Sequence, residues 1–320
     1  IPVVQRKNRY MCLANDHPMN IGYDPDVHLE DADVVIVLEC DVPWIPKKKA
    51  PRADAKIIHI GADPIFASYP LRGFPCDLAI SGVIGATLPA LGQALATREK
   101  RAQSRIDARR KRVQLTHEKM IARLAEKLAK ARVASPIHPA WINQCINDAK
   151  DDNTIVLKEA LTPADGLSFT KAGTYYSLGQ GGALGWSLGT ALGVKAGAPG
   201  KLVITAVGDG SYMFGNPLAA HYVAKAEKWP TLTVVYNNEM WNAVRRNTRE
   251  VYPDGYAARS NREPLTYFEP GTHYEKTIEA FDGYGETVTD PAQLPNALDR
   301  ALNAVGKGQQ ALLNVVSSAG

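Results

Sequence analysis

Two short polar clusters contain the residues best suited to chemistry. Asp209 lies between two glycines at the end of the apolar run KLVITAVG, and Asn237 and Asn238 end the next apolar run, TLTVVY. A carboxylate, an amide oxygen and a backbone carbonyl form an incomplete set of hard oxygen ligands. Such a set suits Mg²⁺, which keeps positions for water and phosphate oxygens. A helix predicted to begin near Ser211 adds unpaired N–H groups and a positive dipole end, so the clusters predict a magnesium-bridged diphosphate site.

The surrounding elements predict how these clusters come together. Strands are predicted at NTIVLKEA, KLVITAVGDG, TLTVVYNN and ALLNVV, and helices alternate with them at NPLAAHYVAKAEKW and PAQLPNALDRALNAV. This alternation is typical of a parallel, doubly wound sheet that binds ligands at the carboxyl ends of its strands. A GDG turn alone often only connects two elements. The asparagine pair on the next strand favours a functional interpretation.

The first part of the chain has a different pattern. DADVVIVLECDVPW and ADAKIIHIGADP carry β-branched apolar runs, which predict buried parallel strands. Residues 98–132 carry most of the excess positive charge and contain no Gly or Pro, so they predict one long helix with a narrow apolar stripe. This helix is either a basic arm for nucleic acid or a solvated connector. We favour the connector because no aromatic residues interleave the charges.

Composition limits the class of protein. An apolar fraction of 45% and a charged fraction of 22%, with no uncharged apolar stretch long enough to span a bilayer, are typical of a soluble globular protein. The four cysteines are far apart and form neither a CxxC pair nor a disulfide-like framework. We therefore expect a cytoplasmic protein with no nucleic-acid or membrane partner. The chain begins at Ile1 without a secretory signal pattern, and we interpret this start as a truncation.

The segment from Gly208 to Trp241 resembles the thiamine-diphosphate signature of the acetolactate synthase, benzoylformate decarboxylase and pyruvate decarboxylase superfamily. Residues 175–197 look like the glycine-rich entry to the same domain, and residues 17–80 resemble the latter part of the family's central domain. The resemblance implies an α/β fold in which part of a Rossmann-like central domain precedes a doubly wound diphosphate-binding domain. The predicted domains are residues 1–83 (partial central domain), 84–133 (helical basic linker) and 134–320 (diphosphate-binding domain).

The resemblance also implies a role for each matching residue. Asp209, the Asn238 side chain and the Met240 carbonyl would bind Mg²⁺. The other residues implied to contact thiamine diphosphate are Gly210, Ser211 and Trp241 along the diphosphate, Leu184 as the apolar prop that bends the cofactor, Gly182 through its carbonyl at the aminopyrimidine, and Thr162 as a further diphosphate contact. Ordinary packing for Leu184 and Trp241, and a turn or cap for Thr162, are the alternatives.

In this family a glutamate on a separate N-terminal domain activates the cofactor, and no segment here resembles that domain. The resemblance therefore implies no catalytic residue within this chain and a site shared between subunits of a homodimer or homotetramer. We expect the chain to be the C-terminal piece of a longer polypeptide. Some relatives use FAD, but the stretch that would contact it is mostly absent, so flavin binding is left open.

The reaction is predicted from a position six residues beyond Asn238. The pyruvate decarboxylase branch has an acidic residue there, whereas this chain has Val244, as the other two branches have an apolar residue. Without that acid, carbon–carbon bond formation can compete with protonation. We expect an acetolactate-synthase-like lyase or carboligase acting on 2-oxo acids. The alternatives are a benzoylformate-type decarboxylase and a cofactor-binding fragment without catalysis.

Four further features are assigned from residue type. Arg245, Arg246 and Arg249 could contact a substrate carboxylate, although a solvated basic face is favoured. The stretch Tyr252–Thr272 is predicted to be an irregular loop and a candidate lid. No motif includes His221 or His273, which we expect to be surface or capping residues.

Overall fold

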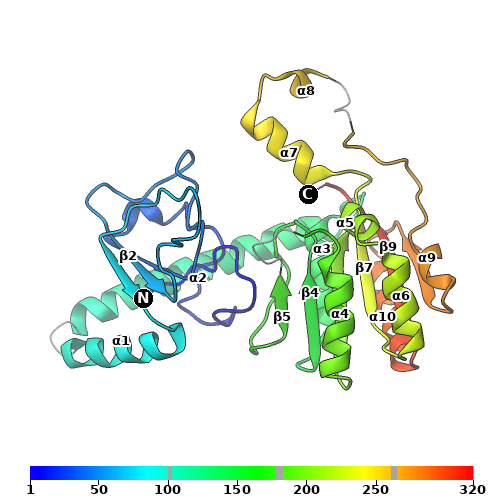
Figure 1. Ribbon diagram of the computed structural model, residues 1–320, viewed down its shortest axis with the longest axis horizontal. Coiled ribbons are helices and arrows are strands. Elements are labelled where there is room, and N and C mark those ends of the chain that lie inside the picture. Colours follow the sequence, from blue (N-terminus) through cyan, green and yellow to red (C-terminus); the bar gives the residue numbers. More distant parts are fainter. Residues whose placement is uncertain (100–102, 178–182, 261–264, 320) are drawn as a thin grey trace. The chain divides into compact units, whose positions relative to one another are not determined.

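The computed structural model describes residues 1–99, 103–177, 183–260 and 265–319. The chain divides into two compact units: Ile1–Asn8 with His17–Met120, and Arg9–Asp16 with Ile121–Gly320 (Figure 1). The division falls within the segment predicted as the linker, and the bounds of the three predicted domains stay predictions. None of the helices in the described residues is both long and apolar enough to cross a membrane.

The first unit is built on a small parallel sheet. Its strands are β1 (Val34–Leu38), β2 (Lys56–Gly61) and β3 (Leu78–Ser81), in the order β1-β2-β3, with a 3-10 turn η1 at Leu29–Asp31. The core under β1 and β2 packs Trp44, which is 1% exposed, edge-on against Phe74. The prediction of buried strands is right for β2 and only partly right for β1, in which Val37 alone is buried. β3, which is not predicted from the sequence, is mostly exposed.

Two helices follow this sheet. They are α1 (Ile84–Glu99) and α2 (Gln103–Ala131), so the predicted single helix over residues 98–132 is wrong at its start, where α1 ends. α2 is not solvated on every side, because Val113 is buried and the His117 ring lies 2.6 Å from the Asn20 carbonyl oxygen. A packed face of this kind supports the connector interpretation over a free basic arm.

The second unit contains a six-stranded parallel sheet in the order β5-β4-β6-β7-β9-β8. Its strands are β4 (Thr154–Lys158), β5 (Tyr175–Ser177), β6 (Leu202–Gly208), β7 (Leu232–Asn237), β8 (Tyr284–Val288) and β9 (Ala311–Val316). Its helices are α3 (Pro139–Ala149), α4 (Trp186–Gly197), α5 (Asp209–Phe214), α6 (Pro217–Ala226), α7 (Asn242–Val251), α8 (Tyr256–Arg259), α9 (Lys276–Glu279) and α10 (Leu294–Gly306).

Helices cover both faces of this sheet (Figure 1). Alternate strand residues such as Val156, Ile204 and Leu313 pack in the core cluster that contains residues of α3 and α10. Their neighbours Leu157 and Val203 pack against α4 on the opposite face. Because helices pack on both faces of the sheet, side chains that point to either face are buried, which explains why these strands are almost continuously apolar. The predicted α/β class with a doubly wound parallel sheet is confirmed.

The strand order contains a reversal that positions a ligand site. After β4 the chain forms β5 on one side of β4 and then returns to form β6 on its other side. In open parallel sheets the crevice at the carboxyl ends of the strands beside such a reversal is the usual place for a ligand. Glu159 directly follows β4 and Asp209 directly follows β6, so two acidic residues lie at this end of the sheet.

Candidate cofactor site

Asp209 is a buried carboxylate at the carboxyl end of β6. Asp209 is only 2% exposed, and its Oδ1 accepts a hydrogen bond from the Gly210 N–H at 2.8 Å. Oδ2 is buried and has no hydrogen-bond partner among the described residues. Burial raises the pKa of Asp209 to about 6, and nearby backbone N–H groups, including those of residues 238–240, partly oppose this effect. An oxygen so placed is costly to bury unless a cation or donor meets it.

The second polar cluster follows β7, next to Asp209. Gly208 of β6 pairs with Tyr236 of β7, so the residues after each strand are lateral neighbours. The Asn238 Oδ1 accepts the Met240 N–H at 3.1 Å in a local turn, and a β-bridge to Tyr267 fixes the backbone at Met240. The parallel strands thus bring Asp209, Asn238 and Met240 to the carboxyl end of the sheet, as the sequence predicts. Their metal-binding roles stay predictions.

Asn237 turns away from this cluster. Its Nδ2 donates to the Asn314 Oδ1 at 3.1 Å, and its Oδ1 accepts the Glu239 N–H at 3.2 Å. Asn314 in turn donates to the Glu275 carboxylate at 3.0 Å. Asn237 is therefore part of a buried network that ties β7 to β9, and only the second asparagine of the pair remains available to a metal.

Trp241 packs tightly on the turn that carries Asp209. A Cβ atom added to Gly210 would lie 2.5 Å from the Trp241 ring, so only glycine fits there. The ring also packs edge-on against Phe268 at a centroid distance of 5.1 Å, and Trp241 is the N-cap residue of α7. These contacts favour the packing alternative for Trp241. Ser211, 9% exposed, lies within α5, which begins at Asp209, two residues before the predicted start.

Thr162 lies beyond the end of β4, in a turn held by a buried lysine. The Lys158 ammonium donates to the carbonyl oxygens of Ala160 at 2.5 Å and Thr162 at 2.6 Å. Burial lowers the pKa of Lys158 to about 8. The Thr162 Oγ1 is buried without a hydrogen-bond partner among the described residues. A free hydroxyl at this crevice is consistent with the predicted diphosphate contact and does not fit a capping role.

Leu184 is half-buried and directly precedes Gly185, the N-cap residue of α4. Gly185 has a φ of +80° and packs against Gly215, where a Cβ on Gly185 would lie 2.2 Å from the Gly215 Cα. The backbone at Leu184 is therefore tightly constrained. Gly182, predicted to contact the aminopyrimidine, lies outside the described residues.

His221 corrects an expectation, because it is buried and not a surface residue. The Tyr212 hydroxyl lies 2.7 Å from its Nε2, and Gln310 Oε1 lies 3.1 Å from its Nδ1. Burial lowers the pKa of His221 to about 4. A neutral imidazole thus links Tyr212 of α5 to Gln310, the residue before β9. His273 has a largely exposed side chain, as expected, and lies 2.7 Å from Glu275.

α7 and the segment that follows it agree in part with the predictions made from the sequence. Arg245, Arg246 and Arg249 lie on α7, which has no buried residue, so it is a surface helix. The predicted irregular loop Tyr252–Thr272 contains the short helix α8, and residues 261–264 lie outside the described part. Val244 is 54% exposed.

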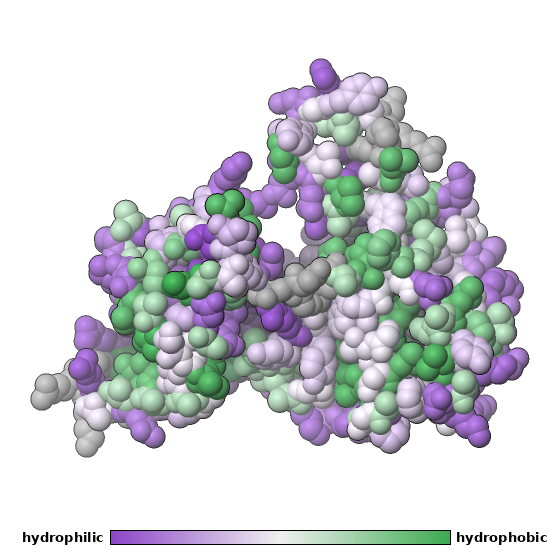
Figure 2. Space-filling model, in the orientation of Figure 1, coloured by the Kyte–Doolittle hydropathy of each residue, from purple (hydrophilic) through white to green (hydrophobic). Residues whose placement is uncertain are grey.

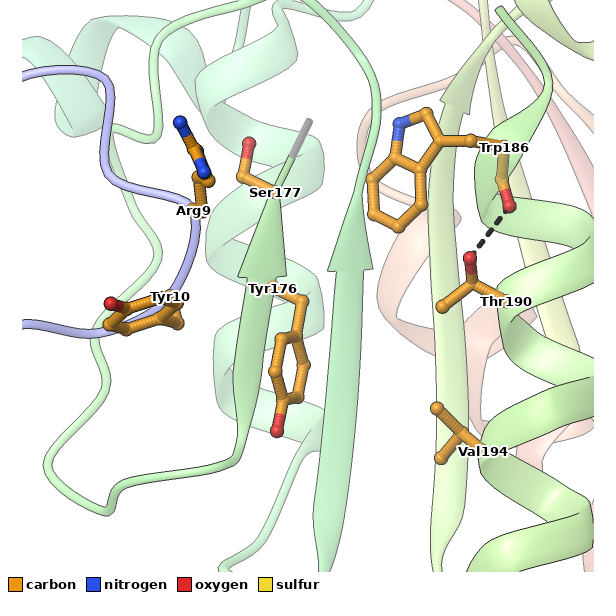
Figure 3. Close-up of a pocket in the computed structure, with 7 residues that line it drawn as sticks. All are labelled: Arg9, Tyr10, Tyr176, Ser177, Trp186, Thr190 and Val194. Atoms are coloured by element: carbon orange, nitrogen blue, oxygen red, sulfur yellow. Dashed lines mark hydrogen bonds between the residues drawn. The ribbon is translucent and has the colours of Figure 1, made fainter. Parts of the chain in front are cut away.

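A surface pocket of about 320 Å³ lies along β5 and the first turns of α4 (Figure 3). Its lining comprises Arg9, Tyr10, Tyr176, Ser177, Trp186, Thr190 and Val194. None of the predicted cofactor residues lines this pocket. The candidate site is therefore defined by the unpaired Asp209 oxygen and the sheet topology, and not by this cavity.

The residues present fit a magnesium-bound diphosphate. In the described part of the chain no three His, Cys, Asp or Glu side chains gather around a possible metal position. A cation at Asp209 would therefore need neutral oxygens and a ligand's own oxygens, which is the usual environment of Mg²⁺. The unpaired Asp209 oxygen supplies a negative charge for the cation. Because Gly210 has no side chain, the backbone there can come close to the diphosphate.

Comparison with known proteins agrees with this fit. Residues 161–315 match the family described as thiamine pyrophosphate enzyme, C-terminal TPP binding domain. Fold and site together define a thiamine-diphosphate-binding domain of the α/β class. Residues 161–315 therefore belong to the C-terminal TPP-binding domain family of thiamine pyrophosphate enzymes.

Relatives of this chain carry different activities. The acetolactate synthase large subunit IlvG of Mycobacterium tuberculosis is 31% identical over 149 residues, which cover 45% of this chain and 24% of that protein. A 2-hydroxyacyl-CoA lyase of Arabidopsis thaliana is 23% identical over 324 residues, covering 93% of this chain and 54% of the relative. Even where it aligns along its whole length, the chain spans about half of such a relative.

The fold is shared with solved structures. The 4-hydroxybenzoylformate decarboxylase of Rhodococcus jostii superposes with a TM-score of 0.71 at 19% identity, covering 99% of this chain and 56% of that one. Benzoylformate decarboxylase from Polynucleobacter necessarius gives a TM-score of 0.69 at 16% identity, covering 100% and 57%. At these identities the likeness establishes the fold.

The buried Asp209 carboxylate predicts a pH-dependent effect on stability in metal-free, cofactor-free protein. Because its pKa is raised from 3.8, the folded state binds this proton more tightly than the unfolded state and loses stability as pH rises to about 6 and beyond. Asp209→Asn should therefore gain stability relative to the wild type between pH 4 and pH 8, by up to about 3 kcal/mol. Urea unfolding with chelator measures this change.

Asp299→Asn, an exposed carboxylate on α10, is the matched control for loss of one charge. A stability difference between Asp209→Asn and the wild type that stays constant from pH 4 to pH 8 would contradict the assignment of a buried, destabilising charge at Asp209.

Proposed function

We propose that this chain forms the diphosphate-binding half of an acetolactate-synthase-like lyase or carboligase acting on 2-oxo acids, with Mg²⁺ and thiamine diphosphate as cofactors. The unpaired, buried Oδ2 of Asp209 beside Asn238 and Met240 is the observation that carries the proposal. The mycobacterial acetolactate synthase relative supports the reaction class.

The proposal gives each candidate residue a task. The Asp209 carboxylate, the Asn238 amide oxygen and the Met240 carbonyl hold Mg²⁺. The residues around the rest of the cofactor are Gly210, Ser211, Trp241 and Thr162 at the diphosphate, Leu184 under the bent rings and Gly182 at the aminopyrimidine. When bound, thiamine diphosphate supplies the electron sink for breaking the bond to a 2-oxo acid's carboxylate. The buried crevice excludes water from the Asp209 carboxylate and so strengthens its attraction for the metal.

The alternative reaction is simple decarboxylation of the benzoylformate type. Position 244 carries valine and not an acid, so it supplies no proton donor, which favours capture of a second carbonyl compound over rapid protonation. The second alternative is a cofactor-binding fragment without catalysis.

We further propose a homodimer or homotetramer in the cytoplasm. Met213, Phe214, Leu218 and Tyr222 expose apolar surface on α5 and α6, and Figure 2 shows hydrophobic surface near these helices. An apolar patch of this kind is typical of a protein interface. All four cysteines are free, which suits a reducing compartment. The proposal includes neither a nucleic-acid nor a membrane partner, and flavin binding is not part of it.

Loss of the metal ligand tests the cofactor site directly. Asp209→Ala should weaken Mg²⁺-dependent binding of thiamine diphosphate more than about 100-fold, because it removes the only charged protein ligand. Isothermal titration calorimetry with and without Mg²⁺ measures the affinity, with Asp299→Ala as the control. If Asp209→Ala binds as the wild type does, the proposed site is wrong.

Product analysis tests the reaction. The natural polypeptide that carries this chain, supplied with pyruvate, Mg²⁺ and thiamine diphosphate, should form acetolactate, which proton NMR identifies. Acetaldehyde as the sole product would refute carboligation and support the decarboxylase alternative. No turnover of pyruvate or benzoylformate would support the cofactor-binding fragment.

Sedimentation velocity tests assembly. Phe214→Glu places a charge in the exposed patch and should shift the protein from dimer or tetramer towards monomer. Tyr256→Glu, a similarly exposed aromatic residue on α8, should leave the sedimentation coefficient unchanged. An unaltered coefficient in Phe214→Glu would exclude this patch as the subunit interface.

A further inference from the structure

Glu159 is a buried acid that no motif identifies. It follows β4, is 2% exposed, and its backbone N–H donates to the Ala206 carbonyl at 2.7 Å. The residue is thereby fixed to β6, beside the crevice that contains Asp209. Side chains of Glu are rarely buried this deeply unless their oxygens have specific partners.

The carboxylate has three partners at the start of α4. Oε1 accepts the Gly185 N–H at 2.5 Å, and Oε2 accepts the Ser187 N–H at 3.0 Å and the Ser187 hydroxyl at 2.5 Å. These N–H groups belong to the N-cap residue and the second residue of the helix, which have no partner within it. Glu159 thus caps α4 from a neighbouring strand.

The structure explains why the cap comes from outside the helix. An N-cap residue normally supplies a Ser, Thr, Asn or Asp side chain. Here that position is Gly185, where any Cβ would clash with Gly215. Close packing of the α4 start on the end of α5 therefore excludes a local cap, and the Glu159 carboxylate replaces it.

The charge of Glu159 is directed specifically at this helix. In the described part of the chain Glu159 forms no ion pair with a lysine or arginine, and its neighbour Lys158 bonds instead to the carbonyls of Ala160 and Thr162. The positive end of the α4 dipole and three donors stabilise the carboxylate. The last residue of β4 and the residue after it thus fix two segments: Lys158 fixes the Thr162 turn, and Glu159 fixes the segment Leu184–Gly185.

We infer that Glu159 is a positioning residue, which holds Leu184 in place under the cofactor rings through its hydrogen bonds to Gly185 and Ser187. This inference rests on the proposed function, because it takes Leu184 to be the apolar prop. The Glu159 carboxylate is hydrogen-bonded to Gly185 and Ser187, and the Asp209 carboxylate to Gly210, so loss of Glu159 should affect the ring portion of the cofactor and spare the diphosphate portion.

The first test uses the ligand-free chain. Glu159→Gln places an amide NH₂ group where a carboxylate oxygen accepts hydrogen bonds, so hydrogen exchange in residues 183–190 should rise about tenfold while β6 and β7 stay protected. Ser187→Ala removes only one of the three bonds and should give a smaller rise. Unchanged exchange in residues 183–190 in both variants overturns the inference.

The second test separates the two halves of the cofactor. With Mg²⁺ present, Glu159→Gln should bind thiamine diphosphate about tenfold more weakly and inorganic diphosphate as tightly as the wild type does. Glu286→Gln is the matched control, because Glu286 is also a hydrogen-bonded carboxylate, paired with Arg300 on the far side of the sheet. It should change neither affinity.

The outcomes distinguish this inference from the proposed function. Equal weakening of both ligands in Glu159→Gln, or an equal effect in Glu286→Gln, would show a general loss of structure and overturn the positioning role. A wild-type chain that binds neither ligand overturns the proposed cofactor site, and with it any role for Glu159 towards that cofactor. Hydrogen exchange at residues 183–190 still tests the cap in that case.

Discussion

The proposed cofactor site of the second unit depends on one buried carboxylate at the reversal in strand order. Asp209 lies where β6 ends, with one oxygen bonded to the Gly210 N–H and the other without a partner among the described residues. A carboxylate in this position reduces the stability of the ligand-free protein because burial opposes its charge. The surrounding elements hold it there: β7 brings Asn238 alongside, and Trp241 packs on the glycine that follows it.

Three buried ionisable groups therefore serve different purposes at neighbouring strand ends. Asp209 keeps an oxygen open to a ligand, whereas Lys158 and Glu159 use their hydrogen-bonding capacity on backbone groups of adjoining segments. Fully bonded buried charges favour one local arrangement over alternatives. We regard the Lys158–Glu159 pair as the support that orders the segments around Thr162 and Leu184, and Asp209 as the group that attracts the metal. Binding and positioning are thus divided among different residues.

Much of this arrangement could be predicted from the sequence. The strands that contain Val156, Ile204 and Val234 are mostly apolar and followed by polar residues, so their parallel arrangement and the proximity of Asp209 to Asn238 follow from local pattern. The strands β5, YYS, and β8, YGETV, carry too few aliphatic residues to be recognised. The assignment of residues 98 and 99 to α1 and not to α2 escapes prediction because the sequences of both helices favour helix.

Other features depend on contacts distant in the sequence. Glu159 acts on residues 26 and 28 positions away, and its neighbours give no local signal of that role. His221 lies on an amphipathic helix, where only the tertiary packing of Tyr212 and Gln310 makes it a buried residue. Asn237 looks equivalent to Asn238 in the sequence, yet the partner at Asn314 directs it into the core. Such roles become visible only when the strands are assembled.

The most direct test of this account is the position of the metal. A crystal of the protein grown with Mn²⁺ and thiamine diphosphate, measured for anomalous scattering, should show the ion within about 2.3 Å of the Asp209 Oδ2, the Asn238 amide oxygen and the Met240 carbonyl oxygen. The cofactor's diphosphate should complete the coordination. An ion bound elsewhere, or thiamine diphosphate bound without contact to Asp209, would contradict the account.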